Sequence, residues 1–237
     1  MDKALDLIEI VAGADRPLRL SEIADAAGLH RATAHRILAD LLERAWVQRT
    51  DDRYLPGAAI LRLSGTAAAD SLAALAHPVL ESLSARTGLM VNLQILEADR
   101  ARVIDVVRPA RLHMITHLRG EALPVHRFAG PLALVAALPP AARHPYLRPA
   151  EDDGHPMDAL GSDLAAAERE GFALEHGRND SLVASLSRAV PAAPLSALTL
   201  VGPDPEFSPA ALPALRTALN EAAETLRALL TRRKPDS

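Results

Sequence analysis

The chain has 237 residues, no cysteine, a formal net charge of −4, 49% hydrophobic residues and 24% charged residues. This composition is typical of a globular protein and excludes collagen-like, coiled-coil, disordered and disulfide-based classes. No apolar run approaches the roughly 18 residues of a membrane span, and the charges at Asp2, Lys3 and Asp6 are not those of a signal peptide. We therefore expect a cytoplasmic protein with no membrane partner.

Residues 1–57 are predicted to form a winged helix-turn-helix domain. Apolar residues at helical spacing indicate a first helix over 4–12. A second helix begins at Leu20, with the Ser21 hydroxyl suited to N-capping, and ends at Gly28.

The third helix of this domain carries an uninterrupted apolar stripe from Ala34 to Ala45. Residues 46–49 and 53–55 follow as two short segments that flank the polar turn Thr50-Asp51-Asp52, and this pattern predicts a hairpin. Three helices, a tight glycine turn and a β-wing together favour the winged helix-turn-helix.

The segment 58–87 is predicted to be helical in two pieces. Its first part, residues 58–71, is expected to serve as a helical linker and dimerisation element, with a hinge at Gly65. Pro78 lies inside the second apolar stripe and is expected to kink that helix or to mark its restart.

From Gly88 onward the pattern changes to strands mixed with helices, so residues 72–232 predict a mixed α/β domain and the whole chain an α+β fold. Strands are predicted over 90–96, 102–108, 113–118, 172–176, 182–190 and 195–201. Helices are predicted over 131–138, 158–170 and 208–230. The stretch 139–156 holds five prolines and predicts an extended loop, and residues 233–237 a disordered tail.

Eight segments carry a pattern that is shared with one family. They are 3–6, 20–29, 31–38 and 53–57 in the first domain, and 77–88, 120–130, 171–173 and 198–203 in the second. Together they resemble the IclR-type bacterial transcriptional regulators. The resemblance implies a DNA-binding domain that dimerises, joined by a helix to a GAF-like effector-binding domain that often pairs dimers into tetramers.

Several positions depart from the family pattern. Ala32 stands where the family usually has serine or threonine, Ser185 where cysteine is common, and Arg188 where proline is typical. Thr199 and Val201 stand where serines are frequent in the final strand. The DNA-binding expectation survives these departures, whereas the identity of the ligand does not follow from the resemblance.

The outer face of the third helix is predicted to contact double-stranded operator DNA, because the N-terminal part of a recognition helix enters the major groove. There Arg36 can pair with a guanine edge, Thr33 can reach a base or a phosphate, and Arg31 lies near the backbone path. Tyr54 either contacts DNA or packs against the helices. A dimer would read two half-sites, so the operator should be palindromic. The predicted DNA contacts are Ser21, Arg31, Ala32, Thr33, His35, Arg36, Arg53 and Tyr54.

A small-molecule pocket is predicted in the second domain around Gly130, whose missing side chain would let a ligand approach a helix N-terminus, a setting that favours a carboxylate. The resemblance adds pocket hydroxyls, which otherwise would satisfy a sheet edge, and two residues at the pocket entrance. Apolar neighbours point to a ligand less polar than a two-carbon acid, so an organic acid and a less polar metabolite both stay open. The predicted contacts are Gly130, Met114, Phe128, Glu175, His176, Ser185, Ser187 and Thr199.

No nucleophile elbow, phosphate-binding glycine loop or zinc-protease motif is present in the sequence, so we expect no enzyme, catalytic residue or cofactor. Two alternatives remain. One is a small-molecule-binding module with weak or no specific DNA binding, motivated by Ala32 and by nine Lys/Arg against ten Asp/Glu over the first 65 residues. The other is an enzyme or metal sensor in which His113, His117 and His126 bind zinc or nickel, although we expect no metal.

Overall fold

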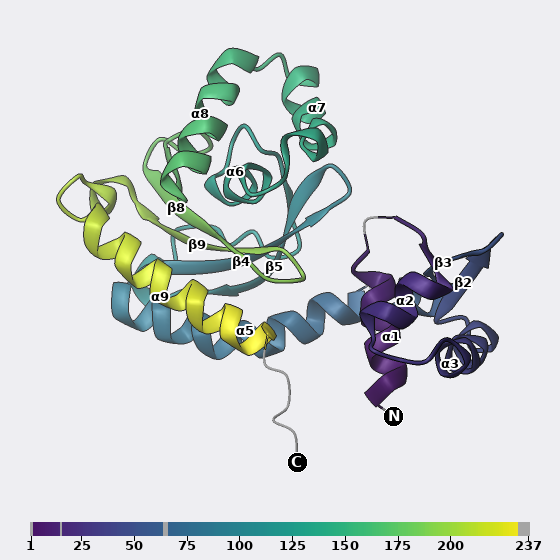
Figure 1. The fold of residues 1–237 in the computed structure, drawn as a ribbon. Coiled ribbons are helices and arrows are strands. Elements are labelled where there is room, and N and C mark those ends of the chain that lie inside the picture. The colour runs from purple at the N-terminus through teal and green to yellow at the C-terminus, as the bar shows by residue number, and fades with distance from the viewer. Residues whose placement is uncertain (1, 15, 64–65, 232–237) are drawn as a thin grey trace. The chain divides into compact units, whose positions relative to one another are not determined.

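The computed structural model describes residues 2–14, 16–63 and 66–231. The chain divides into two compact units, residues 1–71 and 72–237 (Figure 1). The predicted hinge at Gly65 and the predicted tail lie outside the described residues. Among the described helices, none combines the length and the apolar character needed to cross a membrane.

The first unit is a small helical domain with a three-stranded wing (Figure 1). Its helices are α1 (Asp2–Ala12), α2 (Leu20–Ala26), α3 (Arg31–Glu43) and α4 (Ala58–Leu63). Its strands are β1 (Leu18–Arg19), β2 (Val47–Thr50) and β3 (Arg53–Pro56), which pair antiparallel in the order β1-β3-β2. Side chains from all three of the first helices and from the wing form one core that includes Leu7, Ile23, Leu38 and Tyr54.

Helix α2 begins differently from the prediction. Its N-cap is Arg19, not a residue with a capping hydroxyl, and the backbone N–H of Arg19 donates to Glu22 Oε2 at 2.7 Å. Ser21 lies within the helix and is exposed, so the predicted capping role of its hydroxyl is wrong. The predicted end is confirmed: Gly28 has φ +61°, the left-handed conformation that glycine adopts without strain.

Helix α5 (Thr66–Thr87) is a single element that contains Pro78, so the predicted restart at Pro78 is wrong. Pro78 lies on the exposed side of α5, where water can satisfy the carbonyl that proline leaves without its helical donor. The boundary between the two units falls within this helix, after Ser71.

The second unit is built on one six-stranded antiparallel sheet of order β6-β5-β4-β9-β8-β7. Helices α6 to α8 cover one face, and α9 with α5 covers the other (Figure 1). The strands are β4 (Met90–Glu97), β5 (Arg100–Val107), β6 (Ala122–Leu123), β7 (Ala173–His176), β8 (Val183–Val190) and β9 (Ser196–Pro203). The helices are α6 (Ala129–Ala136), α7 (His144–Asp152), α8 (Met157–Glu170) and α9 (Leu212–Thr231). The predicted α+β class, with a mixed α/β C-terminal domain, is confirmed.

Two predicted segments of the second unit are wrong. Residues 113–118 form no strand: they lie in an irregular segment after a short 3-10 helix, and Arg108 Nη1 donates to the backbone oxygens of His113 and Ile115. These bonds hold the segment away from the sheet edge, where the short β6 pairs with β5 instead. The proline-rich stretch 139–156 contains α7: Pro145 lies in its first turn, where a proline sacrifices no helical hydrogen bond, although Pro149 lies inside the helix.

Candidate functional site

The outer face of α3 presents a polar, solvent-exposed surface at its N-terminal end. Ala34, Leu38 and Leu41 are buried and fix the opposite face in the core of the first unit. The predicted DNA contacts on α3 therefore point outward. Arg31, Ala32, His35 and Arg36 are exposed, and Thr33 is half-buried.

Arg31 and Arg36 make no ion pair with any other residue in the described ranges. Other arginines of the first unit are engaged: Arg16 pairs with Glu22 at 2.5 Å, and Arg19 with Asp52 at 3.1 Å. Because Arg31 and Arg36 have no internal anion, their guanidinium groups are available to an external one, such as a phosphate or a guanine edge.

The wing residues differ in their availability. Tyr54 is 3% exposed and packs in the core of the first unit, as the packing alternative expects, so its side chain offers little surface to DNA. Arg53 is half-buried, and its Nη1 donates to the Pro17 carbonyl oxygen at 3.1 Å, which ties the wing to the turn before α2. Arg49, exposed on β2, lies 5.8 Å from the Tyr54 ring centroid.

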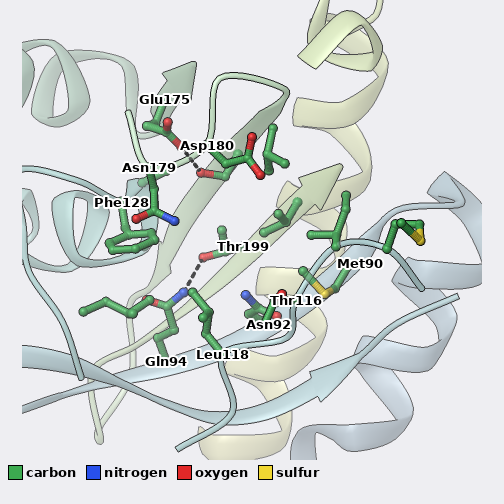
Figure 2. Close-up of a pocket in the computed structure, with 18 residues that line it drawn as sticks. Met90, Asn92, Gln94, Thr116, Leu118, Phe128, Glu175, Asn179, Asp180 and Thr199 are labelled. Atoms are coloured by element: carbon green, nitrogen blue, oxygen red, sulfur yellow. Dashed lines mark hydrogen bonds between the residues drawn. The ribbon is translucent and has the colours of Figure 1, made fainter. Parts of the chain in front are cut away.

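A cavity of about 170 Å³ opens between the sheet of the second unit, the start of α6 and the segment 114–118 (Figure 2). We call it the sheet cavity. Its volume lies below the roughly 300 Å³ at the lower end of drug-sized pockets, so it suits a small metabolite. Its polar lining is Asn92, Gln94, Thr116, Glu175, Asn179, Asp180, Ser185 and Thr199, and its apolar lining includes Met90, Leu118, Leu123, Phe128 and Val201.

The strand register explains why polar side chains gather there. Asn92 on β4 and Ser187 on β8 are both partners of Thr199 on β9. One strand row away, Ser185 on β8 pairs with Glu175 on β7. Residues two apart on a strand share a face, so these side chains form a polar patch on an otherwise apolar sheet.

A directed hydrogen-bond chain orders the amide of Gln94 beside this patch. Ser187 Oγ donates to the Leu198 carbonyl oxygen at 3.1 Å, and the Thr199 hydroxyl donates to Ser187 Oγ at 2.9 Å. Gln94 Nε2 then donates to Thr199 Oγ1 at 3.3 Å (Figure 2). Each hydroxyl has a single hydrogen, so only this direction uses all three contacts. Gln94 Oε1 is left buried without a hydrogen-bond partner among the described residues.

Glu175 is 5% exposed and lines the cavity from β7. Its Oε1 accepts the backbone N–H of Arg178 at 2.6 Å, and its Oε2 accepts the Ser185 hydroxyl at 2.9 Å. The Arg178 guanidinium instead pairs with Asp163 at 2.7 Å. The carboxylate is thus held in place by neutral donors.

The space beside Gly130 is filled by this chain's own atoms. A Cβ on Gly130 would lie 2.1 Å from Gln94 Oε1 and 2.4 Å from Gln94 Cδ. Glycine is therefore required by the close approach of the Gln94 side chain to α6. This differs from the expectation that the missing side chain leaves room for a ligand.

The structure brings most of the predicted pocket residues together. Those that line the sheet cavity are Gly130, Met114, Phe128, Glu175, Ser185 and Thr199. His176 and Ser187 do not line it: His176 Nδ1 lies 2.6 Å from Asp204 Oδ1, and Ser187 is fully buried behind Thr199.

Sequence reasoning missed Asn92, Gln94, Asn179 and Asp180, which also line the cavity. A signal was present for two of them. Asn92 and Gln94 alternate with apolar residues in a strand that is buried on both faces, where unpaired polar side chains are rare.

The histidines proposed as metal ligands differ in their surroundings. His113 and His117 are exposed, whereas His126 is 4% exposed and its Nε2 lies 3.0 Å from Asp153 Oδ2. Burial lowers the pKa of His126 below its ordinary value. Within the part of the chain that the structure describes, no three metal-ligating side chains lie close enough together to hold an ion.

Comparison with known proteins identifies both units. Residues 1–51 match the IclR helix-turn-helix domain, and residues 66–228 match the C-terminal domain of bacterial IclR transcriptional regulators. An HTH-type transcriptional regulator of Mycobacterium tuberculosis is 35% identical over 141 residues, which are 58% of this chain and 54% of that relative. The alignment thus spans about half of the relative's length.

Two solved structures share the fold. An IclR-family protein from a Rhodococcus species superposes with a TM-score of 0.75 at 24% identity, covering 96% of this chain and 92% of the other. An IclR homolog from Microbacterium hydrocarbonoxydans, crystallised with 4-hydroxybenzoate, has a TM-score of 0.58 at 22% identity over 96% and 97% of the two chains. With the family match extending over both units, the chain belongs to the IclR family of bacterial transcriptional regulators.

Proposed function

We propose that this chain is a cytoplasmic, ligand-responsive regulator that binds palindromic operator DNA as a homodimer or a dimer of dimers. The observation that carries the proposal is the N-terminal half of α3, where Arg31 and Arg36 are exposed and have no ion pair with another described residue. Membership of a family of transcriptional regulators supports it.

In the proposed complex, α3 enters the major groove with its N-terminal end toward the bases. Arg36 pairs with a guanine edge, the Ala32 methyl contacts a thymine methyl, and Thr33 and His35 reach bases or phosphates nearby. Arg31 contacts the backbone. Ser21, exposed on α2, and Arg53 on the wing are proposed to contact phosphates, and Tyr54 is not.

The sheet cavity is the proposed effector site, with Gly130, Phe128, Glu175, Ser185 and Thr199 in its wall. The homolog crystallised with 4-hydroxybenzoate supports a small organic molecule as the class of ligand that this fold accommodates. For the ligand to regulate DNA binding, it must have different affinities for the DNA-bound and the free forms of the protein.

The experiment is a selection of duplexes from a random pool by the full chain. The proposal expects enrichment of an inverted repeat whose half-sites are spaced by about one helical turn (~10.5 base pairs) or a multiple of it. Recovery of no common sequence after repeated rounds would contradict it.

A second function has a specific observation in its favour. The first 65 residues hold nine Lys/Arg and ten Asp/Glu, and Arg16, Arg19 and Arg53 are engaged within the unit. This electrostatic balance suits a small-molecule-binding module with weak or no specific DNA affinity. A shallow salt dependence of duplex binding would favour the module, because phosphate contacts release counterions and make binding steeply salt-dependent.

A further inference from the structure

The charged lining of the sheet cavity is entirely acidic in the part of the chain that the structure describes. Glu175 and Asp180 line it, and no arginine, lysine or histidine does (Figure 2). The basic residues that flank Glu175 in sequence are engaged elsewhere, His176 with Asp204 and Arg178 with Asp163.

Neither cavity carboxylate has a cationic partner within the described ranges of the chain. Glu175 is 5% exposed, and neutral donors occupy both its oxygens. Asp180 is exposed, and its Oδ1 accepts the backbone N–H of Leu182 at 3.0 Å. A buried carboxylate without a compensating cation is unfavourable, so a positive group in the cavity would relieve that cost.

Two buried hydrogen-bond acceptors on the opposite side of the cavity independently call for an occupant that carries hydrogen-bond donors. Gln94 Oε1 and Asn92 Oδ1 lie in side chains that are 1% and 3% exposed, and neither oxygen has a hydrogen-bond partner among the described residues. The hydroxyl chain through Thr199 fixes the Gln94 amide with its oxygen as the free atom. An occupant that brings N–H or O–H donors would satisfy them.

The start of α6, by contrast, favours an anion. A helix N-terminus carries the equivalent of about +0.5 charge, against two full negative charges on the carboxylates. The Gln94 amide also covers the Gly130 side of this helix start. Negative potential therefore prevails in the cavity.

We propose that the effector of this regulator is a small organic cation, such as a protonated amine, held between Glu175 and Asp180 on one side and the amide oxygens of Asn92 and Gln94 on the other. This inference rests on the proposed function of the sheet cavity as the effector site. It replaces the expectation of a carboxylate ligand for this member of the family.

The test uses three probes that share a ring and differ in charge at neutral pH: benzylamine, benzyl alcohol and benzoate. Calorimetric titration of the full chain should show benzylamine binding at least about tenfold more tightly than benzoate. Benzoate binding as tightly as benzylamine, or no binding by any of the three probes, would overturn the proposal.

The Glu175→Gln variant isolates the charge. Glutamine can accept from the Arg178 N–H and donate to Ser185 Oγ, so both hydrogen bonds are retained. We expect benzylamine to bind about tenfold more weakly and benzyl alcohol to change by less than about twofold. The matched control is Glu151→Gln, on the exposed face of α7, which should change neither affinity.

If Glu175→Gln does not fold by circular dichroism, Asp180→Asn at the exposed carboxylate makes the same comparison. Unchanged benzylamine affinity in the folded variant would overturn the proposal. Operator binding without ligand is measured in parallel. If the wild-type chain prefers benzylamine but binds no operator, only the proposed function is contradicted. If it binds operator but prefers benzoate, only the choice of a cation is contradicted.

Discussion

Replacing Gly130 by alanine tests the packing in the wall of the sheet cavity. The new methyl would lie 2.1 Å from Gln94 Oε1, 2.4 Å from Cδ and 2.5 Å from Nε2, so the amide must move. Moving the amide breaks the hydrogen bond from Gln94 to Thr199, which costs about 0.5–1.5 kcal/mol of stability. The added methyl also overpacks the site, which costs about 1–3 kcal/mol. The gain in helix propensity offsets about 0.5–1 kcal/mol.

The net expectation is a destabilisation of about 0.5–4 kcal/mol, which lowers the Tm of a unit of this size by roughly 1–16 °C. Far-UV circular dichroism follows the transition. The fluorescence of Trp46, the single tryptophan, monitors the first unit and should show an unchanged transition.

The double variant with Gln94→Ala gives the sharper result. Without the amide, the three atoms nearest to the new methyl are gone, so Gly130→Ala should change sign and stabilise the Gln94→Ala protein by up to about 1 kcal/mol. A Gly130→Ala penalty of equal size in both backgrounds would refute the assignment of the clash to Gln94.

Three further predictions follow from the structure. Gly57→Ala should lower the Tm reported by Trp46 fluorescence by more than Gly130→Ala lowers the Tm reported by far-UV circular dichroism. A Cβ at position 57 would lie 2.3 Å from the Ala45 carbonyl oxygen, which is a backbone atom and cannot rotate away as a side chain can. The pKa of Glu22 is lowered to about 2 by Arg16 and the Arg19 N–H. The contribution of ionised Glu22 to the free energy of unfolding should therefore be complete above the ordinary carboxyl pKa and be lost as the pH falls from about 5 to about 2. In urea titrations, Glu22→Gln should flatten this acid dependence. Burial lowers the pKa of His126, so below about pH 6.5 this residue binds more protons in the unfolded chain than in the folded one. The free energy of unfolding of the second unit should therefore fall as the pH decreases from about 6.5. A His126→Gln variant whose stability has the same pH dependence as the wild type would contradict this.

The first unit could be predicted well because its signals are local. The stripe of α3 with Ala34, Leu38 and Leu41, and the left-handed position at Gly28, depend on neighbours a few residues apart. The N-cap of α2 was missed because the Glu22 carboxylate, at the third helical residue, accepts the backbone N–H of Arg19 and so closes the helix start without a capping hydroxyl.

The second unit exposes the limit of local patterns. Residues 113–118 were predicted as a strand, yet the hydrogen bonds that the Arg108 guanidinium donates to their backbone oxygens hold them in an irregular segment. A local sequence pattern carries no information on whether a partner strand is free at the sheet edge.

The sheet cavity depends on contacts between residues far apart in sequence. Gln94 and Thr199 are 105 positions apart, and only the register of β4 against β9 brings them together. Gly130 was identified, but its physical reason is the approach of the Gln94 side chain, which no local pattern contains. The same applies to Asn92, whose free oxygen is evident only once the lining is assembled.

The central claim is that the exposed end of α3 reads operator DNA, and one measurement tests it most directly. Fluorescence anisotropy with the duplex that flanks the protein's own gene compares the wild type with Arg36→Ala across a salt series. Arg169→Ala, an exposed arginine on α8, is the matched control. We predict salt-sensitive, sequence-selective binding that Arg36→Ala weakens by about 1–3 kcal/mol and Arg169→Ala leaves unchanged. Equal, weak binding of all three proteins to the operator and to an unrelated duplex would contradict the account.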